Sequence, residues 1–318
     1  MASLSIYLFV LGGVALSLAF ILDVMHTTVL ATGRREVRAG TPALAGAGAG
    51  ASGGSTALAG GGSSALAGGP GSGSLSYRTE TRAGSIAHGF TWLAFLALVG
   101  SLAIRAYLVG RGPWGNMYEF SVAFAMGIVG GYLYLARRYA IRTIAFVPVG
   151  VALFLLGYAA TLPSDIEPLV PALHHPPLLT IHVVMAVLSY GILTVSFGAA
   201  VGYLIQGEQD RFSWLPTHKV LDEVAYRAVI IGFPIFAALI ILGSYWASIA
   251  WGRYWGWDPK ETSALVTWLI YAVYLHARSL RGWAGRPAAL ILVLGFAAMI
   301  FTYFGNLYFS GLHSYSGL

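Results

Sequence analysis

The chain of 318 residues contains no cysteine. This absence excludes disulfides, thiol redox chemistry and thiolate metal sites in the protein. Any metal chemistry must therefore come from its eight histidines, its six methionines or its carboxylates.

Charged residues are also scarce, since they make up 9% of the chain, whereas 57% of the residues are hydrophobic. The mean hydropathy of +0.73 is typical of an integral membrane protein. Lysine and arginine number 18 against 12 acidic residues. In a membrane protein such a surplus indicates orientation, so we expect no nucleic-acid partner.

Eight apolar segments have about the ~20 residues that cross a bilayer, and lipid leaves only helices able to satisfy their backbone groups. We therefore predict an all-α, polytopic membrane protein with eight transmembrane helices. The predicted spans are 4–25, 87–109, 116–136, 143–162, 178–205, 226–250, 260–278 and 287–309. The first segment lacks a preceding basic region and a small-residue cleavage site, which favours a retained span over a signal peptide.

The composition divides the chain into three parts. Residues 1–31 are predicted to hold the first transmembrane helix, and residues 86–318 a domain of seven helices. Between them, residues 32–85 are predicted to form a cytoplasmic linker, in which 39–76 is rich in Gly, Ala and Ser and repeats "ALAG" at 43, 57 and 65.

The positive charges predict the orientation. If the amino terminus lies outside, fourteen of the eighteen lysines and arginines fall in inner loops, and the outer side keeps Arg105, Arg111, Arg253 and Lys260. This bias places both termini outside. It also places on the outer side the residues 251–268, "WGRYWGWDPKETSALVTW", a stretch that holds four of the nine tryptophans.

Two interpretations of this stretch are compatible. Tryptophan is typical of membrane interfaces, and Asp258, Pro259 and Glu261 have the spacing of an N-cap, a proline at N1 and a capping-box acid. Indoles crowded together with Gly252 and Gly256 also indicate a surface on which a large flat ligand can approach the backbone.

Histidines supply candidate ligands for such a cofactor. His182 and His313 are predicted on the same outer side, where two neutral imidazoles could coordinate a haem iron with the indoles covering the porphyrin. The neighbouring His174 and His175 are alternatives. A lone histidine at a wet boundary can also be merely polar.

His276 is predicted roughly 25 Å further in along its helix. An ionisable residue at that depth indicates a functional site. His276 could equally belong, with Arg278 and Arg281, to a group of basic residues at the inner membrane surface. His26 and His88, at the inner ends of their spans, could join or replace it.

The stretch from Trp251 to Arg278 resembles the tryptophan-rich WWD signature of haem-handling proteins, in the form found in the CcsA (ResC) family of system II cytochrome c assembly. Further matching segments are "GNMYEF" at 115–120, "IHVVMAVLSYG" at 181–191 and "NLYFSGLHSYSG" at 306–317. Together the matches extend over most of the chain after about residue 86.

The resemblance implies roles for particular residues. His182 and His313 would be the outer axial ligands of a b-type haem, and His276 would be a ligand of a second, intramembrane haem. That inner site would be completed by a histidine of a separate CcsB (ResB) partner. The predicted haem platform and the residues that shape it are Trp251, Trp255, Trp257, Asp258, Gly252, Tyr254, Gly256, Pro259 and Glu261.

The function implied is that of the haem-binding component of a holocytochrome c synthase in the cytoplasmic membrane. It would present haem at the outer face to the Cys-x-x-Cys-His segment of apocytochrome c. No catalytic acid or base is assigned. The alternatives are a respiratory di-haem b-type electron-transfer subunit, which would bury its histidine pairs within the bundle, and a cofactor-free transporter or scaffold.

Overall fold

The computed structural model describes residues 1–39, 81–166, 168, 173, 176–280, 282–305 and 308–313, and their secondary structure is helical. The described elements are α1 (Ala2–Ala39), α2 (Arg82–Val109), α3 (Met117–Ala136), the 3₁₀ helix η1 (Arg142–Ile144), α4 (Phe146–Ala160), α5 (Pro176–Gln206), α6 (His218–Trp251), α7 (Pro259–Leu280) and α8 (Arg286–Phe304).

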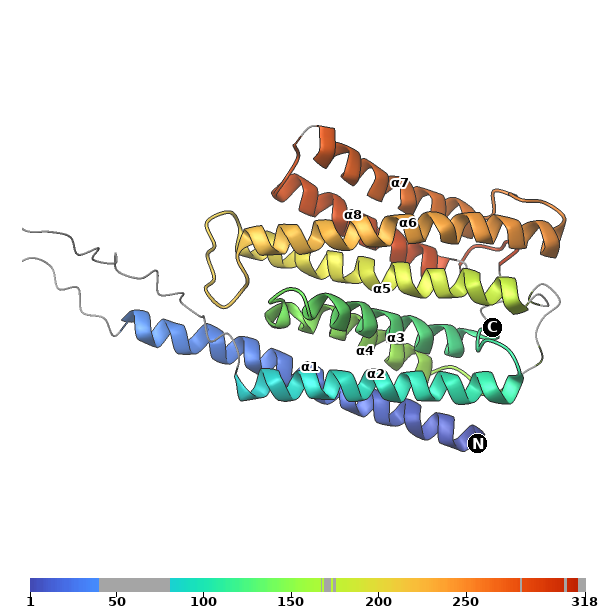
Figure 1. The fold of residues 1–318 in the computed structure, drawn as a ribbon, viewed down its shortest axis with the longest axis horizontal. Helices are drawn as coiled ribbons and strands as arrows, with labels where there is room; N and C mark the ends of the chain where they lie inside the picture. The colour runs from blue at the N-terminus through green and yellow to red at the C-terminus, as the bar shows by residue number, and fades with distance from the viewer. Residues whose placement is uncertain are drawn as a thin grey trace, which may run out of the picture.

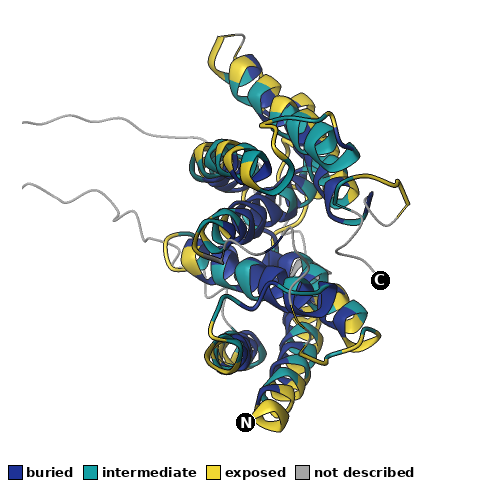
Figure 2. Ribbon diagram, turned by 90° about the vertical axis from the view of Figure 1, so that its right-hand side faces the viewer, coloured by how far each residue is buried: buried dark blue, intermediate teal, exposed yellow. Residues whose placement is uncertain are grey.

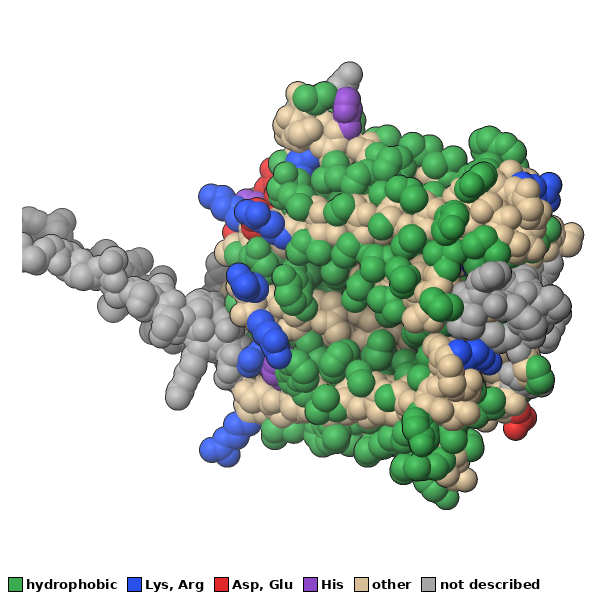
Figure 3. Space-filling model, turned by 45° about the vertical axis from the view of Figure 1, so that its right-hand side comes forward, with side chains coloured by type: hydrophobic (Ala, Val, Ile, Leu, Met, Phe, Trp, Pro, Cys, Tyr) green, Lys and Arg blue, Asp and Glu red, His purple; other side chains and the backbone are tan. Residues whose placement is uncertain are grey.

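The helices run up and down along one axis of the molecule (Figure 1). The beginning of α1, the α2–α3 and α6–α7 connections and the end of α8 lie at one end, which we call the cavity end. The α3–α4, α5–α6 and α7–α8 connections lie at the other end, which we call the arginine end. Figure 3 shows Lys and Arg side chains gathered at the arginine end, on the left of that view.

Helix α5 lies at the centre, where it packs against α3, α6 and α8. Glycines allow the close approach of α3 and α5, because a Cβ on Gly191 would collide with the carbonyl oxygen of Gly127. A Cβ on Gly131 would lie 2.9 Å from the carbonyl carbon of Gly191. Small residues at such crossings are typical of helix pairs in membranes.

Exposed apolar side chains lie along the outside of the bundle (Figure 3). The buried residues fill its interior (Figure 2). Helix α1 shows the pattern most clearly, since Tyr7, Val14, Ile21 and Val29 are all exposed along it. A water-soluble protein would bury such side chains, so this surface fits contact with lipid.

Six of the eight described helices are long and apolar enough to cross a membrane. The two others are α4, which has 15 residues against the ~20 of a full span, and α7, which falls short in hydropathy. The prediction of an all-helical, multi-pass membrane protein is confirmed. The count of eight spans and the sides on which the termini lie stay predictions.

The helix ends differ from the predicted boundaries at several places. Helix α1 continues to Ala39, beyond the predicted end of the first part at residue 31, and α2 begins at Arg82, within the predicted linker 32–85. The predicted span 143–162 is α-helical only over Phe146–Ala160, because Arg142–Ile144 forms the 3₁₀ turn η1. The Gly/Ala/Ser-rich segment lies outside the described residues except for Ala39.

Candidate functional site

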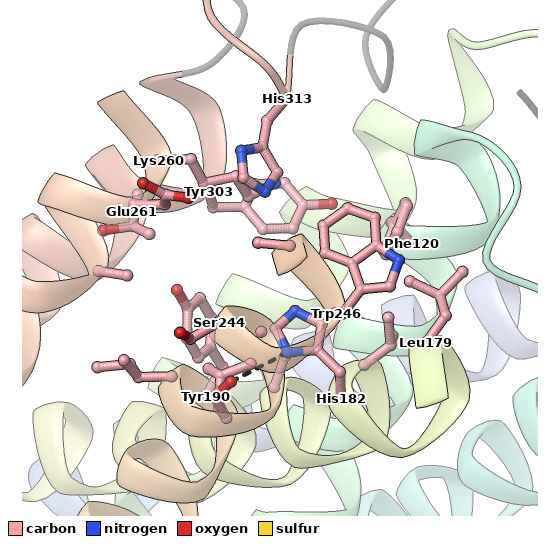
Figure 4. Close-up of a pocket in the computed structure, with 18 of the residues that line it drawn as sticks. Phe120, Leu179, His182, Tyr190, Ser244, Trp246, Lys260, Glu261, Tyr303 and His313 are labelled. Carbon is pink, nitrogen blue, oxygen red and sulfur yellow. Dashed lines mark hydrogen bonds between the residues drawn. The ribbon is translucent and has the colours of Figure 1, made fainter. Parts of the chain in front are cut away.

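A cavity opens at the cavity end between α3, α5, α6, α7 and the segment after α8. It contains about 1100 Å³ of empty space, including its mouth. Aromatic and aliphatic side chains form most of its lining, and its polar groups include two imidazoles, one ammonium and one carboxylate. These four groups belong to His182, His313, Lys260 and Glu261 (Figure 4).

His182, in the second turn of α5, is held against α6. Its Nδ1 lies 3.0 Å from the carbonyl oxygen of Leu239. Because a carbonyl only accepts hydrogen bonds, Nδ1 carries the proton and Nε2 is left with a lone pair. Gly243 makes room for the ring, since a Cβ there would lie 2.6 Å from Cε1 of His182.

His313 enters from the opposite side and is held by Asp258. Its Nδ1 lies 2.8 Å from Oδ1 of Asp258, a residue that is 5% exposed. The same carboxylate accepts the backbone N–H of Lys260 at 2.9 Å and that of Leu312 at 2.6 Å. One acidic group therefore joins the start of α7 to the segment that carries His313.

The electrostatics of this pair fix its protonation. Burial alone raises the pKa of the Asp258 carboxyl. The hydrogen bonds from His313, Lys260 and Leu312 outweigh burial and hold that pKa well below its usual range. Burial lowers the pKa of His313, against the opposing effect of its hydrogen bond to Asp258. The carboxylate is thus ionised and the imidazole neutral, with the proton on Nδ1.

The two imidazoles face each other across the cavity. Figure 4 shows His313 on one side and His182 on the other, each with a ring nitrogen directed toward the other ring. In both rings Nδ1 donates to an oxygen of the protein, so Nε2 is the nitrogen that faces the cavity. A metal-ligating histidine usually donates its other ring N–H to an oxygen of the protein, as both imidazoles do here.

Trp246 is a site residue that the sequence interpretation did not include. Its side chain is almost fully buried and stacks on His182, with ring centroids 6.2 Å apart and planes 18° apart. Its ring also lies 5.9 Å from that of His313 and 4.7 Å from that of Trp251. The sequence does show a tryptophan at this position, five residues before the tryptophan-rich stretch 251–268. It lies within the predicted span 226–250, where an indole gives no indication of a site.

The predicted platform residues occupy different places. Trp251 meets the ring of His313 edge-on at 4.8 Å, and Trp255 lines the cavity. Trp257 and Tyr254, by contrast, are 70% and 63% exposed. Trp257 also has a left-handed backbone, with φ 55°, which turns its side chain away from the packed bundle.

The glycines of the stretch act through the backbone. Gly252 ends α6 with φ 72°, and the N–H of Gly256 donates to Oε2 of Glu261 at 2.8 Å. The predicted capping arrangement of α7 is also present. The side chain of Asp258 accepts from the N–H of Lys260, and the N–H of Asp258 donates to Oε2 of Glu261 at 3.1 Å. The capping interpretation is therefore right, and the Asp258 carboxylate that caps α7 also holds His313.

The other candidate histidines that the structure describes do not line this cavity. His276 is exposed on α7 near the arginine end. His26 is buried, with Nδ1 2.7 Å from Oγ1 of Thr81. His88 lies on α2 near the same end. His174, His175 and Arg281 lie outside the described residues.

Arg278, expected in a basic cap with His276, forms a two-point ion pair. Its Nη1 and Nη2 lie 2.7 and 2.5 Å from the carboxylate oxygens of Asp222 on α6. This pair ties α7 to α6 at the arginine end and neutralises the guanidinium locally.

The donor set of the cavity suits a particular kind of metal group. Within the described residues, no cluster of three or more His, Asp or Glu side chains could hold a bare metal ion. Two imidazoles on opposite walls suit a metal that brings its own equatorial ligands, as the iron of a porphyrin does. The apolar, aromatic lining suits the faces of such a macrocycle.

The comparisons with known proteins decide the family. A family model described as "Cytochrome C assembly protein" matches residues 114–313, which contain every helix from α3 to α8. The chain is 35% identical over 260 residues to the cytochrome c biogenesis protein CcsA of Guillardia theta, covering 73% of this chain and 86% of that protein. The chain belongs to the CcsA family of cytochrome c biogenesis proteins.

Other relatives agree with this assignment. CcsA of Prochlorococcus marinus is 34% identical over 256 residues, covering 71% of this chain and 82% of the relative. Among solved structures, the cytochrome c haem lyase CcmF superposes with a TM-score of 0.60 at 18% identity, over 93% of this chain. The chain spans 46% of the length of that protein, and the likeness shows the fold alone.

Family membership assigns this CcsA-family protein a role in cytochrome c biogenesis. That role disfavours one alternative drawn from the sequence, a respiratory di-haem subunit.

Proposed function

We propose that this protein is the haem-binding component of a system II cytochrome c synthetase, and that it holds a b-type haem between His182 and His313 for attachment to apocytochrome c. One observation carries the proposal. The two imidazoles face each other across an apolar cavity, and each is held by an acceptor on its far ring nitrogen. Haem is the cargo, delivered to another protein.

The remaining lining supports a haem in this position. Trp246, Trp251 and Trp255 offer aromatic faces to the macrocycle. Lys260 lines the cavity, and no carboxylate of the described residues forms an ion pair with it. Its ammonium would therefore pair with a haem propionate, because a cation in an apolar wall requires an anion.

The protein residues act by holding and orienting the haem. Haem brings the iron and the two vinyl groups to which the thiols of apocytochrome c add. Asp258 fixes the tautomer and the orientation of His313, and burial keeps the imidazole neutral. His313 could then ligate the haem and be displaced by the histidine of the Cys-x-x-Cys-His segment. The exposed Trp257 and Tyr254 at the cavity end would receive that segment.

His276 is proposed as a ligand of a second haem, further toward the arginine end. Its exposure on α7 is what such a role requires, because the second ligand would come from a histidine of a CcsB (ResB) partner. The gathering of Lys and Arg at the arginine end supports a cytoplasmic location for that end and an outer location for the cavity. The membrane proposed is the cytoplasmic membrane.

The test is an absorption spectrum of the purified protein with and without dithionite, for the wild type and the variants His182→Ala and His313→Ala. The matched control is His88→Ala, which removes a histidine near the arginine end. We expect a reduced b-type spectrum in the wild type and the control, and a weakened or shifted spectrum in both cavity variants. A wild type that stays colourless after incubation with haem would refute the proposal.

A further inference from the structure

The first turns of α5, which carry His182, are held by hydrogen bonds to two other parts of the fold. On one side, Nδ1 of His182 donates to the carbonyl oxygen of Leu239 on α6 at 3.0 Å. On the other, Oγ1 of Thr180 accepts the indole N–H of Trp114, in the α2–α3 connection, at 3.2 Å. Residues two apart in an α-helix lie about 200° apart around its axis, so the two bonds are on nearly opposite faces of α5.

The hydroxyl of Thr180 is used differently from those of two other buried threonines. Thr91 and Thr194 donate to a carbonyl one turn earlier in their own helices, that of Ala87 at 2.9 Å and that of Tyr190 at 2.7 Å. Such a bond joins nothing beyond the helix. Thr180 instead joins α5 to a separate connection, and it supplies the acceptor for a buried indole whose N–H would be costly to leave unpaired.

A glycine makes room for this hydrogen bond. A Cβ on Gly112 would collide with the indole nitrogen of Trp114 and would lie 2.7 Å from Oγ1 of Thr180. Non-bonded heavy atoms prefer about 3.5–4.0 Å. The backbone of Gly112 therefore passes directly beside the bond, and a larger residue there would displace one of its two partners.

The connection that carries Trp114 is itself fixed by a buried carboxylate. Oε2 of Glu119 accepts the backbone N–H of Gly115, the residue after Trp114, at 2.7 Å. Oε1 of Glu119 lies 2.9 Å from Nε of Arg105 on α2, and both side chains are 2% exposed. Nη1 of Arg105 donates to the carbonyl oxygen of Ser164, in the α4–α5 connection, at 2.9 Å. Because breaking a buried ion pair is strongly unfavourable, Trp114 is attached to a rigid base.

We propose that Trp114 and Thr180 are positioning residues for His182, whose hydrogen bond fixes the rotation of α5 about its axis. The inference rests on the proposed function, in which Nε2 of His182 ligates the haem iron. A ring nitrogen roughly 6 Å from a helix axis moves by about 1 Å when the helix turns by about 10°. Because the bonds of Thr180 and His182 lie on opposite faces, such a turn would lengthen one of them. The pair therefore keeps Nε2 directed into the cavity.

The test uses single substitutions in the full-length protein. Thr180→Val removes the hydroxyl and keeps the branched shape, and Thr180→Ser keeps the hydroxyl. Trp114→Phe removes the donor at the other end of the bond. Thr194→Val is the matched control, because it makes the same change at a buried threonine of the same helix whose hydroxyl donates within that helix.

The first measurement is nitrogen NMR of the histidine-labelled protein without haem, which reports the protonated nitrogen of His182. Its signal is the one that His182→Ala lacks. We expect the Nδ1–H tautomer in the wild type, Thr180→Ser and Thr194→Val. In Thr180→Val and Trp114→Phe the Nε2–H tautomer should appear as well, because the bond to Leu239 is weakened. A wild-type tautomer in Thr180→Val would overturn the inference, as would an equal change in Thr194→Val.

The second measurement is titration with haem. We expect the Kd to rise about three- to tenfold in Thr180→Val and in Trp114→Phe, which is the value of one hydrogen bond. The double variant should lose no more, since both changes remove the same bond. Thr180→Ser and Thr194→Val should bind haem as the wild type does. An unchanged Kd in Thr180→Val would also overturn the inference. A wild type that binds no haem would refute the proposed function, and the tautomer would still decide whether the bond orients His182.

Discussion

Gly243→Ala provides the sharpest test of the proposed ligand geometry, because it adds one methyl group beside His182. The new Cβ would lie 2.6 Å from Cε1 and 3.1 Å from Nδ1 of the imidazole. Carbon atoms in contact prefer about 3.5–4.0 Å, so the ring must move by roughly 1 Å. Movement of that size breaks the 3.0 Å hydrogen bond from Nδ1 to the carbonyl of Leu239.

The expected loss of haem affinity follows from the two functions of that hydrogen bond. It sets the tautomer of His182 and the direction of Nε2. Loss of such a hydrogen bond to a metal-ligating histidine typically lowers metal affinity by about 10–100-fold. We therefore expect the Kd for haem to rise by about that factor in Gly243→Ala. The change is measured by titrating haem into the purified protein and following its absorbance.

Two comparisons separate this effect from general damage to the fold. Gly157→Ala on α4 is the matched control, because a Cβ there meets nothing within 4 Å, and its haem affinity should equal that of the wild type. In a His182→Ala background, Gly243→Ala should cost no further affinity, since the glycine acts only through the imidazole. The reasoning fails if Gly243→Ala binds haem as tightly as the wild type, or if its loss of affinity persists in that background.

Three further predictions concern residues at and just before the start of α7. Asp258→Ala should weaken haem binding by about 10–100-fold, because His313 loses the carboxylate that orients it; haem titration measures this effect. The same substitution should destabilise the protein by about 1 kcal/mol, because α7 loses its N-cap; thermal melting measures this effect. Lys260→Met should weaken binding of haem about tenfold, as expected for one ion pair. It should leave binding of haem dimethyl ester unchanged, and an equal loss with the ester would exclude the propionate contact. Trp257→Ala should keep the haem affinity of the wild type, because the indole is 70% exposed. It should lower the yield of thioether-linked cytochrome c several-fold when the variant is co-expressed with apocytochrome c. A full yield would show that Trp257 does not receive the Cys-x-x-Cys-His segment.

Much of the candidate site could be predicted from local sequence. The spacing of Asp258, Pro259 and Glu261 specified the start of α7, because a capping box depends only on neighbours along the chain. The indoles of the stretch were likewise visible as a cluster. Their separation into cavity-lining Trp255 and exposed Trp257 was not predictable, since it depends on the left-handed turn at Trp257.

The sequence by itself determined that this is an all-helical membrane protein with a tryptophan-rich connection next to one acidic cap. Apolar segments of spanning length and local capping patterns need no distant partner, so composition and short spacings are sufficient to specify them. Only the tertiary structure decided which imidazoles meet and what orients them. His182 depends on the carbonyl of Leu239 and on the space left by Gly243, and His313 depends on a carboxylate 55 residues earlier in the chain. These contacts join different helices, and a single sequence carries no record of which helix faces lie against each other until packing brings them together.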